Sequence, residues 1–358
     1  MNILSALQKI DKRVTLLNKR VVRKKPLFVM RAAYHCLRQK VFNRSGYRGV
    51  MFATHYECNF SCTHCYEKRL TKTEGRPLSF EEKRDIIKQC LDLGIIAFDF
   101  IGGESHLDPR FEELVTLCKP ERTYITLATN GYNFTEEKIR RYLSLGIDKL
   151  NISIDSWYPA DHDSFRRKRG AHEHALKTLS LCKRQDMDVT ISVVVFKDYT
   201  KQPGFKKLVN FAIENKLRLA FKLSVPVGQW EGEIDNLATD SDKKILYKLH
   251  QRYPFLTRDI YGNSHNGCPA FKDFFTITAY GDVLPCNSIH VSFGNLREES
   301  LLSILNKSKK VKLFSENITG CHPAEDREFI NNYLSKSFVS GSYPVKAENV
   351  FDELMTSK

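Results

Sequence analysis

Six short apolar segments alternate with helical patterns through the middle of this 358-residue chain. The segments predicted as strands are residues 50–54, 95–101, 123–129, 149–154, 188–195 and 218–223. The helical patterns between and around them are residues 79–93, 110–118, 135–145, 171–185 and 204–216. The first helical pattern opens with Ser79 and Glu82 at the spacing of a capping box. This alternation predicts a parallel α/β sheet, whose active residues lie at the C-terminal ends of the strands.

Three cysteines follow the first predicted strand directly, as Cys58, Cys62 and Cys65 in a C-x3-C-x2-C spacing. Three thiolates on one short loop can hold three irons of an iron–sulfur cube and leave the fourth iron open to a small molecule. His55 and His64 lie beside them, so a structural zinc site with a histidine ligand is the alternative. The spacing favours a cluster over zinc.

Polar residues and glycines follow the next three predicted strands. Gly102-Gly103-Glu104 comes after the second strand and Asn130 after the third. Two glycines let a ligand approach the backbone, and a carboxylate can receive an ammonium group. Ser153 and Asp155 alternate with apolar residues, which predicts that both face inward and need hydrogen-bond partners. The alternative for Asp155 is the N-cap of the next helix.

A second set of cysteines lies in the C-terminal third of the chain. Cys268 is followed by twelve residues, Gly281, four residues and Cys286, and Cys321 stands further on. The apolar segments at residues 274–278 and 283–284 flank a turn and predict a hairpin.

Taken together and in this order, the motifs resemble those of the radical S-adenosylmethionine (SAM) superfamily, and the C-terminal part is similar to its SPASM/twitch subgroup. The resemblance spans residues 49 to about 351. It implies an α/β fold with a partial (βα)6 barrel, a small C-terminal α+β domain and a basic helical N-terminal arm. The expected divisions are residues 1–48, 49–230 and 231–358.

The resemblance also assigns roles to the motif residues. Cys58, Cys62 and Cys65 would hold a [4Fe-4S] cluster that binds SAM, and Glu104 would hold the SAM amino group, although Ser105 replaces the usual proline. Arg166 or Arg169 would neutralise the SAM carboxylate. The remaining cofactor-binding candidates are Phe60, which would pack the adenine, His64, Gly102, Gly103, Asn130, Ser153 and Asp155.

The C-terminal cysteines match the opening of the SPASM/twitch pattern, without the dense cysteine array of a full SPASM domain. This favours one auxiliary [4Fe-4S] cluster on Cys268, Cys286 and Cys321. Its fourth ligand is open among His322, another residue and the substrate. A zinc site built from these three cysteines and His322 is the alternative.

Most of the net charge of +14 lies at the N-terminus, where residues 1–48 contain 13 Lys or Arg and one acid. Apolar residues there fall along one helical face, namely Leu4, Leu7, Val14, Leu17 and Val21. A basic amphipathic helix can lie on an anionic membrane surface or hold an acidic partner. An arm that covers one end of the barrel is the other interpretation, and nucleic acid is disfavoured because the segment shows no recognised nucleic-acid-binding module.

The chain contains no apolar segment long enough to cross a bilayer and no recognisable secretory signal. This favours a cytoplasmic protein, or one held at the inner face of the membrane by residues 1–48. The four remaining cysteines are interpreted as packing residues, namely Cys36, Cys90, Cys118 and Cys182.

By resemblance, the protein is an enzyme that cleaves SAM reductively to a 5′-deoxyadenosyl radical, which takes hydrogen from a substrate. The reductant would be a flavodoxin or a ferredoxin. The substrate class stays open among peptides, sugars or other small molecules, and lipid-linked intermediates. The alternative is a zinc-stabilised, non-enzymatic binding or scaffold protein that uses its basic arm on membrane or nucleic acid.

Overall fold

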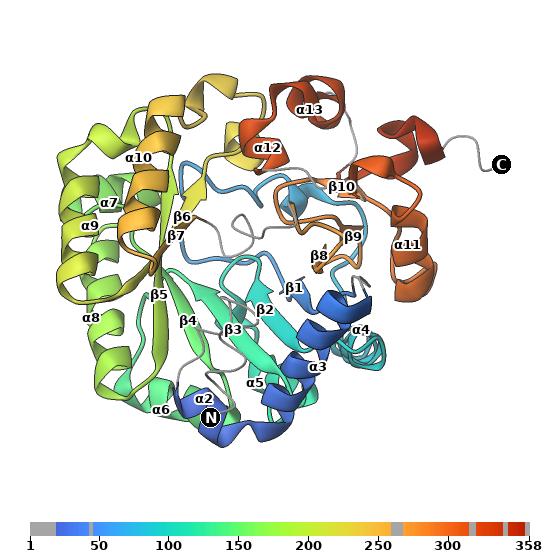
Figure 1. Cartoon of the computed structure of the whole chain (residues 1–358), viewed down its shortest axis with the longest axis horizontal. Coiled ribbons are helices and arrows are strands. Elements are labelled where there is room, and N and C mark those ends of the chain that lie inside the picture. The colour runs from blue at the N-terminus through green and yellow to red at the C-terminus, as the bar shows by residue number, and fades with distance from the viewer. Residues whose placement is uncertain (1–18, 43–45, 259–267, 315–319, 339–342, 355–358) are drawn as a thin grey trace.

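A curved, mostly parallel sheet organises the computed structural model, which describes residues 19–42, 46–258, 268–314, 320–338 and 343–354 (Figure 1). Within these residues the sheet has nine strands in the order β7-β6-β5-β4-β3-β2-β1-β8-β9. The six predicted strands are β1 (Gly49–Ala53), β2 (Ala97–Ile101), β3 (Tyr124–Thr129), β4 (Lys149–Ser153), β5 (Asp188–Val195) and β6 (Arg218–Leu223). All six pair in parallel with their neighbours, which confirms the predicted α/β barrel type.

Helices cover the outer face of the sheet. They are α4 (Phe80–Asp92), α5 (Phe111–Leu117), α6 (Glu136–Leu145), α7 (Pro159–Arg166), α8 (Ala171–Arg184), α9 (Pro203–Glu214) and α10 (Asp240–Arg252). The capping box predicted at the start of α4 is present, because the side chains of Ser79 and Glu82 each accept a hydrogen bond from the other residue's backbone. The sequence pattern did not predict α7, the helix that carries Arg166.

Alternation along each strand separates the core from the inner face. In β2, Phe98 and Phe100 are buried in the main core against the helices, whereas Asp99 lies on the other side of the strand. The same two-residue period in β4 places Leu150 and Ile152 in that core. The inner face is therefore free to carry polar groups toward the C-terminal strand ends.

The predicted C-terminal hairpin is present as β8 (Phe274–Ile277) and β9 (Val283–Leu284), and it joins the barrel sheet. The strand β8 pairs in parallel with β1, from Gly49 opposite Phe274 to Phe52 opposite Ile277. At the other edge, β7 (Leu256–Arg258) extends the sheet beyond β6. The sequence analysis predicted neither the pairing of β8 with β1 nor that of β7 with β6. A local sequence pattern does not show which distant segment a strand will pair with. The predicted divisions after residues 48 and 230 stay predictions.

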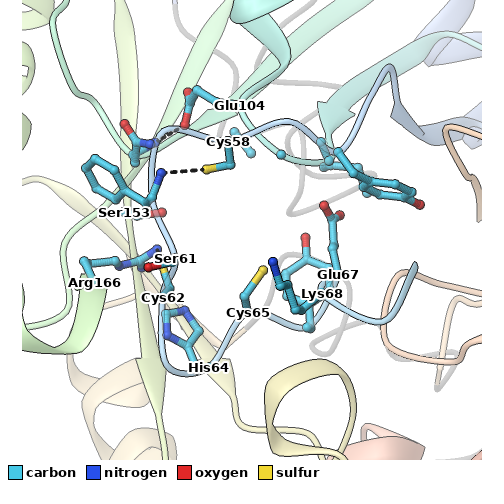
Figure 2. A pocket seen from close by; sticks show the side chains of 18 of the residues that line it. Cys58, Ser61, Cys62, His64, Cys65, Glu67, Lys68, Glu104, Ser153 and Arg166 are labelled. Atoms are coloured by element: carbon cyan, nitrogen blue, oxygen red, sulfur yellow. Dashed lines mark hydrogen bonds between the residues drawn. The ribbon is translucent and has the colours of Figure 1, made fainter. Parts of the chain in front are cut away.

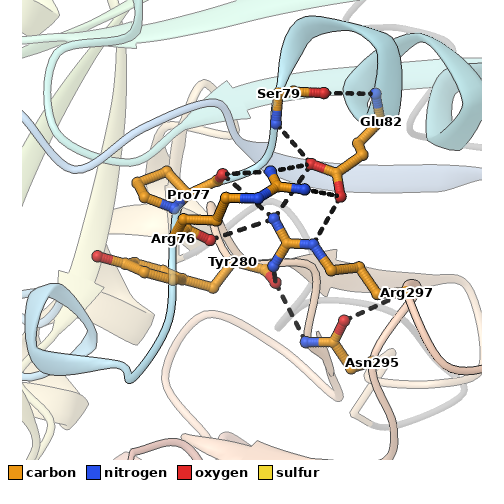
Figure 3. A network of polar contacts seen from close by, with 7 residues as sticks. All are labelled: Arg76, Pro77, Ser79, Glu82, Tyr280, Asn295 and Arg297. Atoms are coloured by element: carbon orange, nitrogen blue, oxygen red, sulfur yellow. Dashed lines mark hydrogen bonds and ion pairs between the residues drawn. The ribbon is translucent and has the colours of Figure 1, made fainter.

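A polar network fastens this C-terminal hairpin to the first barrel helix (Figure 3). The Arg297 guanidinium donates to both carboxylate oxygens of Glu82, at 2.6 and 3.1 Å, and to the backbone oxygens of Arg76, Pro77 and Tyr280. Glu82 also accepts from the Arg76 side chain. The hydrogen bonds from these arginines hold the pKa of Glu82 far below its ordinary value.

Smaller elements complete the C-terminal region. They are α11 (Leu301–Ser308), α12 (His322–Glu325), α13 (Arg327–Asn332) and the parallel pair β10 (Val291–Ser292) and β11 (Val345–Lys346). No helix among the described residues is both long and apolar enough to span a membrane.

The N-terminal arm covers the N-terminal ends of the strands, as one of its two interpretations predicted. Its described part is α2 (Lys19–Lys24) and α3 (Pro26–Phe42), at the lower edge of the sheet in Figure 1. Lys25, between the two helices, lies 2.5 Å from Asp148 and donates to the backbone oxygens of Thr123 and Gly146. Four of the five residues of the predicted amphipathic face lie outside the described residues, and the fifth, Val21, is buried.

Candidate active site

The C-terminal strand ends and the cysteine loop enclose a cavity of about 210 Å³ (Figure 2). The predicted site residues that line this cavity are Cys58, Phe60, Cys62, His64, Cys65, Gly102, Gly103, Glu104, Asn130, Ser153 and Arg166. Figure 2 shows the three cysteines spaced around one open space, with Ser153 and Arg166 on one side and Glu67 on the other. Residues from five parts of the chain thus meet at a single site.

The cysteine loop holds its thiols by local hydrogen bonds. The Phe60 amide donates to the sulfur of Cys58 at 3.4 Å, and the Cys65 amide donates to the Cys62 carbonyl at 3.3 Å. Burial raises the pKa of the Cys58 thiol to about 11 and that of Cys65 to about 12. Metal ligation requires the thiolate, so binding of iron must displace these protons.

The two glycines place the end of β2 directly against the cysteine loop. Gly103 and Glu104 donate backbone hydrogen bonds to the carbonyls of His55 and Glu57, at 3.0 and 2.8 Å. A Cβ atom on Gly103 would overlap the Glu57 carbonyl, and one on Gly102 would overlap that of His55. The sequence predicted close approach of a ligand here, and the structure shows close approach of the loop backbone.

Glu104 is almost completely buried, with 2% of its surface exposed. One carboxylate oxygen accepts from the Asn130 amide at 3.0 Å, and the other accepts from the Thr129 hydroxyl and lies 3.0 Å from Nδ1 of His106. A carboxylate offers about four acceptor directions, so room is left for one more donor. Ser105, where proline was expected, is also accommodated, because its hydroxyl donates to the Ile101 carbonyl at 2.5 Å.

Arg166 rather than Arg169 lies at the site, because Arg166 is buried beside the cavity and Arg169 is exposed. Its Nε donates to Asp155 at 2.6 Å, and its NH1 lies 3.9 Å from the sulfur of Cys62. The other Asp155 oxygen accepts from the Val194 amide at 3.0 Å. Burial opposes ionisation of Asp155, but the charge and hydrogen bond of Arg166, together with nearby His64 and His162, outweigh it, so the pKa of Asp155 is lowered.

Ser153 and Asp155, predicted as an inward pair, therefore differ in position. Ser153 lines the cavity, whereas Asp155 is fully buried and its carboxylate binds protein groups. The N-cap position of α7 is Tyr158, so Asp155 does not cap that helix. Its contacts suit a residue that positions Arg166.

Aromatic contacts fix two further candidates in the loop. The ring of His64 stacks on Phe165, with centroids 4.4 Å apart and planes 5° from parallel, and Phe60 makes an edge contact with Tyr132 at 5.5 Å. Burial lowers the pKa of His64 to about 3, so its imidazole is neutral. The Asn130 side chain joins the same wall, because its Nδ2 donates to Asn59 at 2.8 Å.

Two residues of the site were missed by the sequence analysis, His106 and Glu67. Glu67 is 3% exposed and lines the cavity, and its Oε2 has no hydrogen-bond partner. Burial raises its pKa to about 8. In the sequence, Glu67 is marked only by its place two positions after Cys65, and His106 lies in an ordinary turn. The sequence analysis therefore could not single out either residue.

Phe274 in the hairpin lies near the surroundings of both Cys268 and Cys286. The backbone of Phe274 donates to Pro269, next to Cys268, and the side chain of Phe274 belongs to the apolar cluster against which Cys286 packs. Cys321 begins α12, where its amide donates to Glu325 at 2.8 Å. Glu325 in turn lies 2.5 Å from Arg258 at the end of β7. This region therefore spans both edges of the sheet.

Within the residues that the structure describes, no three or more His, Cys, Asp or Glu side chains are arranged to hold a single metal ion. A zinc ion draws thiolates to within about 2.3 Å of one point. An iron–sulfur cube instead distributes its thiolates over separate irons.

Comparison with known proteins agrees with this geometry. Residues 54–209 match the family model of the radical SAM superfamily, and residues 268–326 match that of an iron–sulfur cluster-binding domain, SPASM. The AdoMet-dependent heme synthase of Methanosarcina barkeri is 24% identical over 69% of this chain and 78% of its own. The GTP 3′,8-cyclase of Clostridium perfringens is 25% identical over 76% of this chain and 93% of its own.

The crystal structure of Streptococcus suis SuiB bound to its precursor peptide SuiA has the same fold, with a TM-score of 0.60 at 16% identity over 77% of this chain and 69% of that chain. This chain is thus an enzyme of the radical SAM superfamily that uses SAM and a [4Fe-4S] cluster and carries an iron–sulfur cluster-binding SPASM domain.

Proposed function

We propose that Cys58, Cys62 and Cys65 hold the [4Fe-4S] cluster, and that SAM binds beside it in the cavity at the C-terminal strand ends. The observation that carries this proposal is the shared cavity, which brings the three thiols together with the Gly102-Gly103-Glu104 motif. When bound, the cluster and SAM supply a 5′-deoxyadenosyl radical by one-electron reduction. This radical would take a hydrogen atom from the substrate.

The protein groups bind SAM by complementary charge. Glu104 retains one acceptor direction for the methionyl ammonium group, and Arg166 presents its guanidinium to the methionyl carboxylate. Asp155 fixes the guanidinium and so positions it, without contacting SAM. Ser153 and Asn130 donate to the ribose, Phe60 packs against the adenine, and His64 closes the wall beside Cys62.

The auxiliary [4Fe-4S] cluster is proposed to bind to Cys268, Cys286 and Cys321. His322 is the proposed candidate for its fourth ligand, because its Nδ1 lies 3.0 Å from Asp326 while its Nε2 is buried without a hydrogen-bond partner. A carboxylate on one imidazole nitrogen is the usual support of a metal-bound histidine. A flavodoxin or ferredoxin is the proposed reductant.

The proposed substrate is a peptide or a small molecule, including a sugar or a lipid-linked intermediate. The relatives differ in this respect, since one is named a heme synthase, another a GTP cyclase, and SuiB was crystallised with a precursor peptide. The buried Oε2 of Glu67 lies on the side of the cavity away from Ser153. A buried carboxyl oxygen without a hydrogen-bond partner favours a substrate with a hydroxyl group, which can donate or accept.

Reductive cleavage of SAM tests the proposal. The full-length protein is reconstituted anaerobically with iron and sulfide, reduced with dithionite and supplied with SAM, and 5′-deoxyadenosine is measured. Nucleoside formation that is lost in Glu104→Ala and kept in Glu112→Ala, an acid on the outside of α5, is the expected result. A reconstituted protein that holds iron and sulfide and yet forms no nucleoside would overturn the proposed reaction.

A further inference from the structure

The helix α3 has two apolar faces, and only one of them is covered by the barrel. Phe28 and Val29 are buried against Ile96 and Tyr124, at the N-terminal ends of β2 and β3. The opposite face presents four exposed side chains, Leu27 at 51%, Met30 at 67%, Tyr34 at 60% and Leu37 at 56%. Their spacing of three, four and three residues forms one stripe along the helix.

Exposed hydrophobic side chains are concentrated in this stripe and are not scattered evenly over the surface. Among the described residues, eight large hydrophobic side chains are exposed, and half of them belong to this one helix. Single exposed apolar residues need no explanation, but a contiguous apolar surface marks an interaction site. We therefore expect this face of α3 to bind a partner.

The charge around the stripe identifies the kind of partner. Residues 19–38 contain seven Lys or Arg and no acid. Lys25 is committed to Asp148, and Arg31 donates to backbone oxygens of the barrel. Arg23 and Lys24 are exposed at the end of α2, just before α3 begins. A helix with apolar side chains beside unopposed cations complements an anionic surface.

We propose that α3 docks this protein onto an anionic membrane surface, with Leu27, Met30, Tyr34 and Leu37 entering the interfacial region. A second copy of the chain is disfavoured as the occupant, because symmetric pairing of two such helices would bring like charges together. A lipid surface supplies both the apolar interior and the negative headgroups.

The position of α3 also defines the orientation of the bound enzyme. The helix contacts the barrel around the N-terminal ends of β2 and β3, whereas the cavity lies beyond the opposite ends of those strands. The docked protein would turn its cavity away from the bilayer. The membrane then anchors the enzyme and does not present the lipid interior to the radical.

Vesicle flotation tests the proposal with the full-length protein. Vesicles of phosphatidylcholine alone are compared with vesicles of phosphatidylcholine and phosphatidylglycerol at three to one. We expect binding to the anionic vesicles only, reduced roughly tenfold or more in the variant Leu27→Ser/Met30→Ser/Tyr34→Ser/Leu37→Ser. We expect weaker binding at higher salt, and in Arg23→Gln/Lys24→Gln.

The matched control replaces exposed apolar residues on other helices, Tyr247→Ser/Leu302→Ser, which are 58% and 54% exposed and should leave binding unchanged. Equal circular dichroism of all variants verifies the fold. No binding of the wild type to anionic vesicles would overturn the proposal, and so would full binding of the four-residue variant. A dimer in light scattering that this variant dissociates would assign the face to a second copy, and vesicle-independent capture of an acidic protein would assign it to a protein partner.

Discussion

Arg166 and Asp155 form a buried ion pair at the edge of the cavity, with Nε and Oδ2 2.6 Å apart and the second guanidinium nitrogen facing the sulfur of Cys62 at 3.9 Å. Asp155 lies two residues beyond the end of β4, and Arg166 is the last residue of α7. The pair therefore ties the sheet to the helix that the cysteine loop contacts, since the amide of Thr63 donates to the carbonyl of Phe165. The Asp155 carboxylate thus holds the Arg166 guanidinium in place, where both the cluster and SAM would contact it.

Substitution of either Asp155 or Arg166 should lower the stability of the fold or the affinity for SAM. Asp155→Ala leaves a buried guanidinium unpaired, which costs on the order of 3–5 kcal/mol in the free energy of unfolding. Arg166→Lys keeps the charge but loses the fork geometry, so we expect SAM affinity to fall by about tenfold with a smaller loss of stability. Urea denaturation and SAM binding by calorimetry measure the two effects. Arg169→Lys, at the exposed neighbouring arginine, is the control, and an equal loss there would contradict the assignment.

His162 should make the protein sensitive to acid. The Asp155 amide donates to its Nδ1 at 3.1 Å, and burial lowers the pKa of His162 from 6.5 to about 4. In the unfolded chain His162 takes up a proton below about pH 6.5, whereas in the folded protein it does so only near pH 4. The free energy of unfolding therefore falls as the pH falls from about 6.5 to about 4. The slope approaches 1.4 kcal/mol per pH unit at most, by the linkage relation.

The variant His162→Asn keeps an acceptor for the Asp155 amide and does not titrate. We expect its urea midpoint to change less than that of the wild type between pH 6.5 and pH 4, the window set by the lowered pKa. Identical pH profiles for both proteins would mean that His162 does not carry this acid sensitivity.

Gly103 should tolerate no side chain. The added Cβ of Gly103→Ala would meet the Glu57 carbonyl, which is backbone and can yield only if the cysteine loop moves. We expect a loss of about 1–3 kcal/mol in stability and incomplete iron incorporation after reconstitution. Gly46→Ala is the control, because no atom lies within 4 Å of its added Cβ. Normal iron content in Gly103→Ala would show that the loop does not depend on this contact.

Lys25 should hold the N-terminal arm on the barrel. Lys25→Met removes the partner of Asp148 and two donors to backbone oxygens. A buried carboxylate left without its cation costs on the order of 3–5 kcal/mol, less whatever protonation recovers. The neighbouring Lys24→Met changes an exposed side chain and should alter stability by about 0.5 kcal/mol or less. Equal thermal midpoints for the two variants would contradict this role.

Much of the fold could be predicted because its signals are local. The bounds expected for β5 and β6 agree with the structure, and Ser79 with Glu82 marks the start of α4. The pairing of β8 with β1 could not be predicted, since it joins residues 49–52 to residues 274–277 with no signal in either segment alone.

The cavity residues were predicted because strand ends collect polar side chains at one edge of a parallel sheet. Glu67 and His106 were not, because their importance comes from burial and from neighbours that only the folded chain supplies. Asp155 was predicted to face the cavity by its alternation, but the strand ends at Ser153, so the two-residue period no longer determines its direction.

The measurement that tests the central claim most directly compares wild type with Cys58→Ala/Cys62→Ala/Cys65→Ala after anaerobic reconstitution, counting iron per chain and 5′-deoxyadenosine formed from SAM. Cys90→Ala, at a buried cysteine of the core, serves as the control and should behave as wild type. We predict that the triple variant forms no nucleoside and keeps about four irons per chain, against about eight in the wild type, as two [4Fe-4S] cubes require. Undiminished nucleoside formation by the triple variant would contradict the assignment of these cysteines to the catalytic cluster.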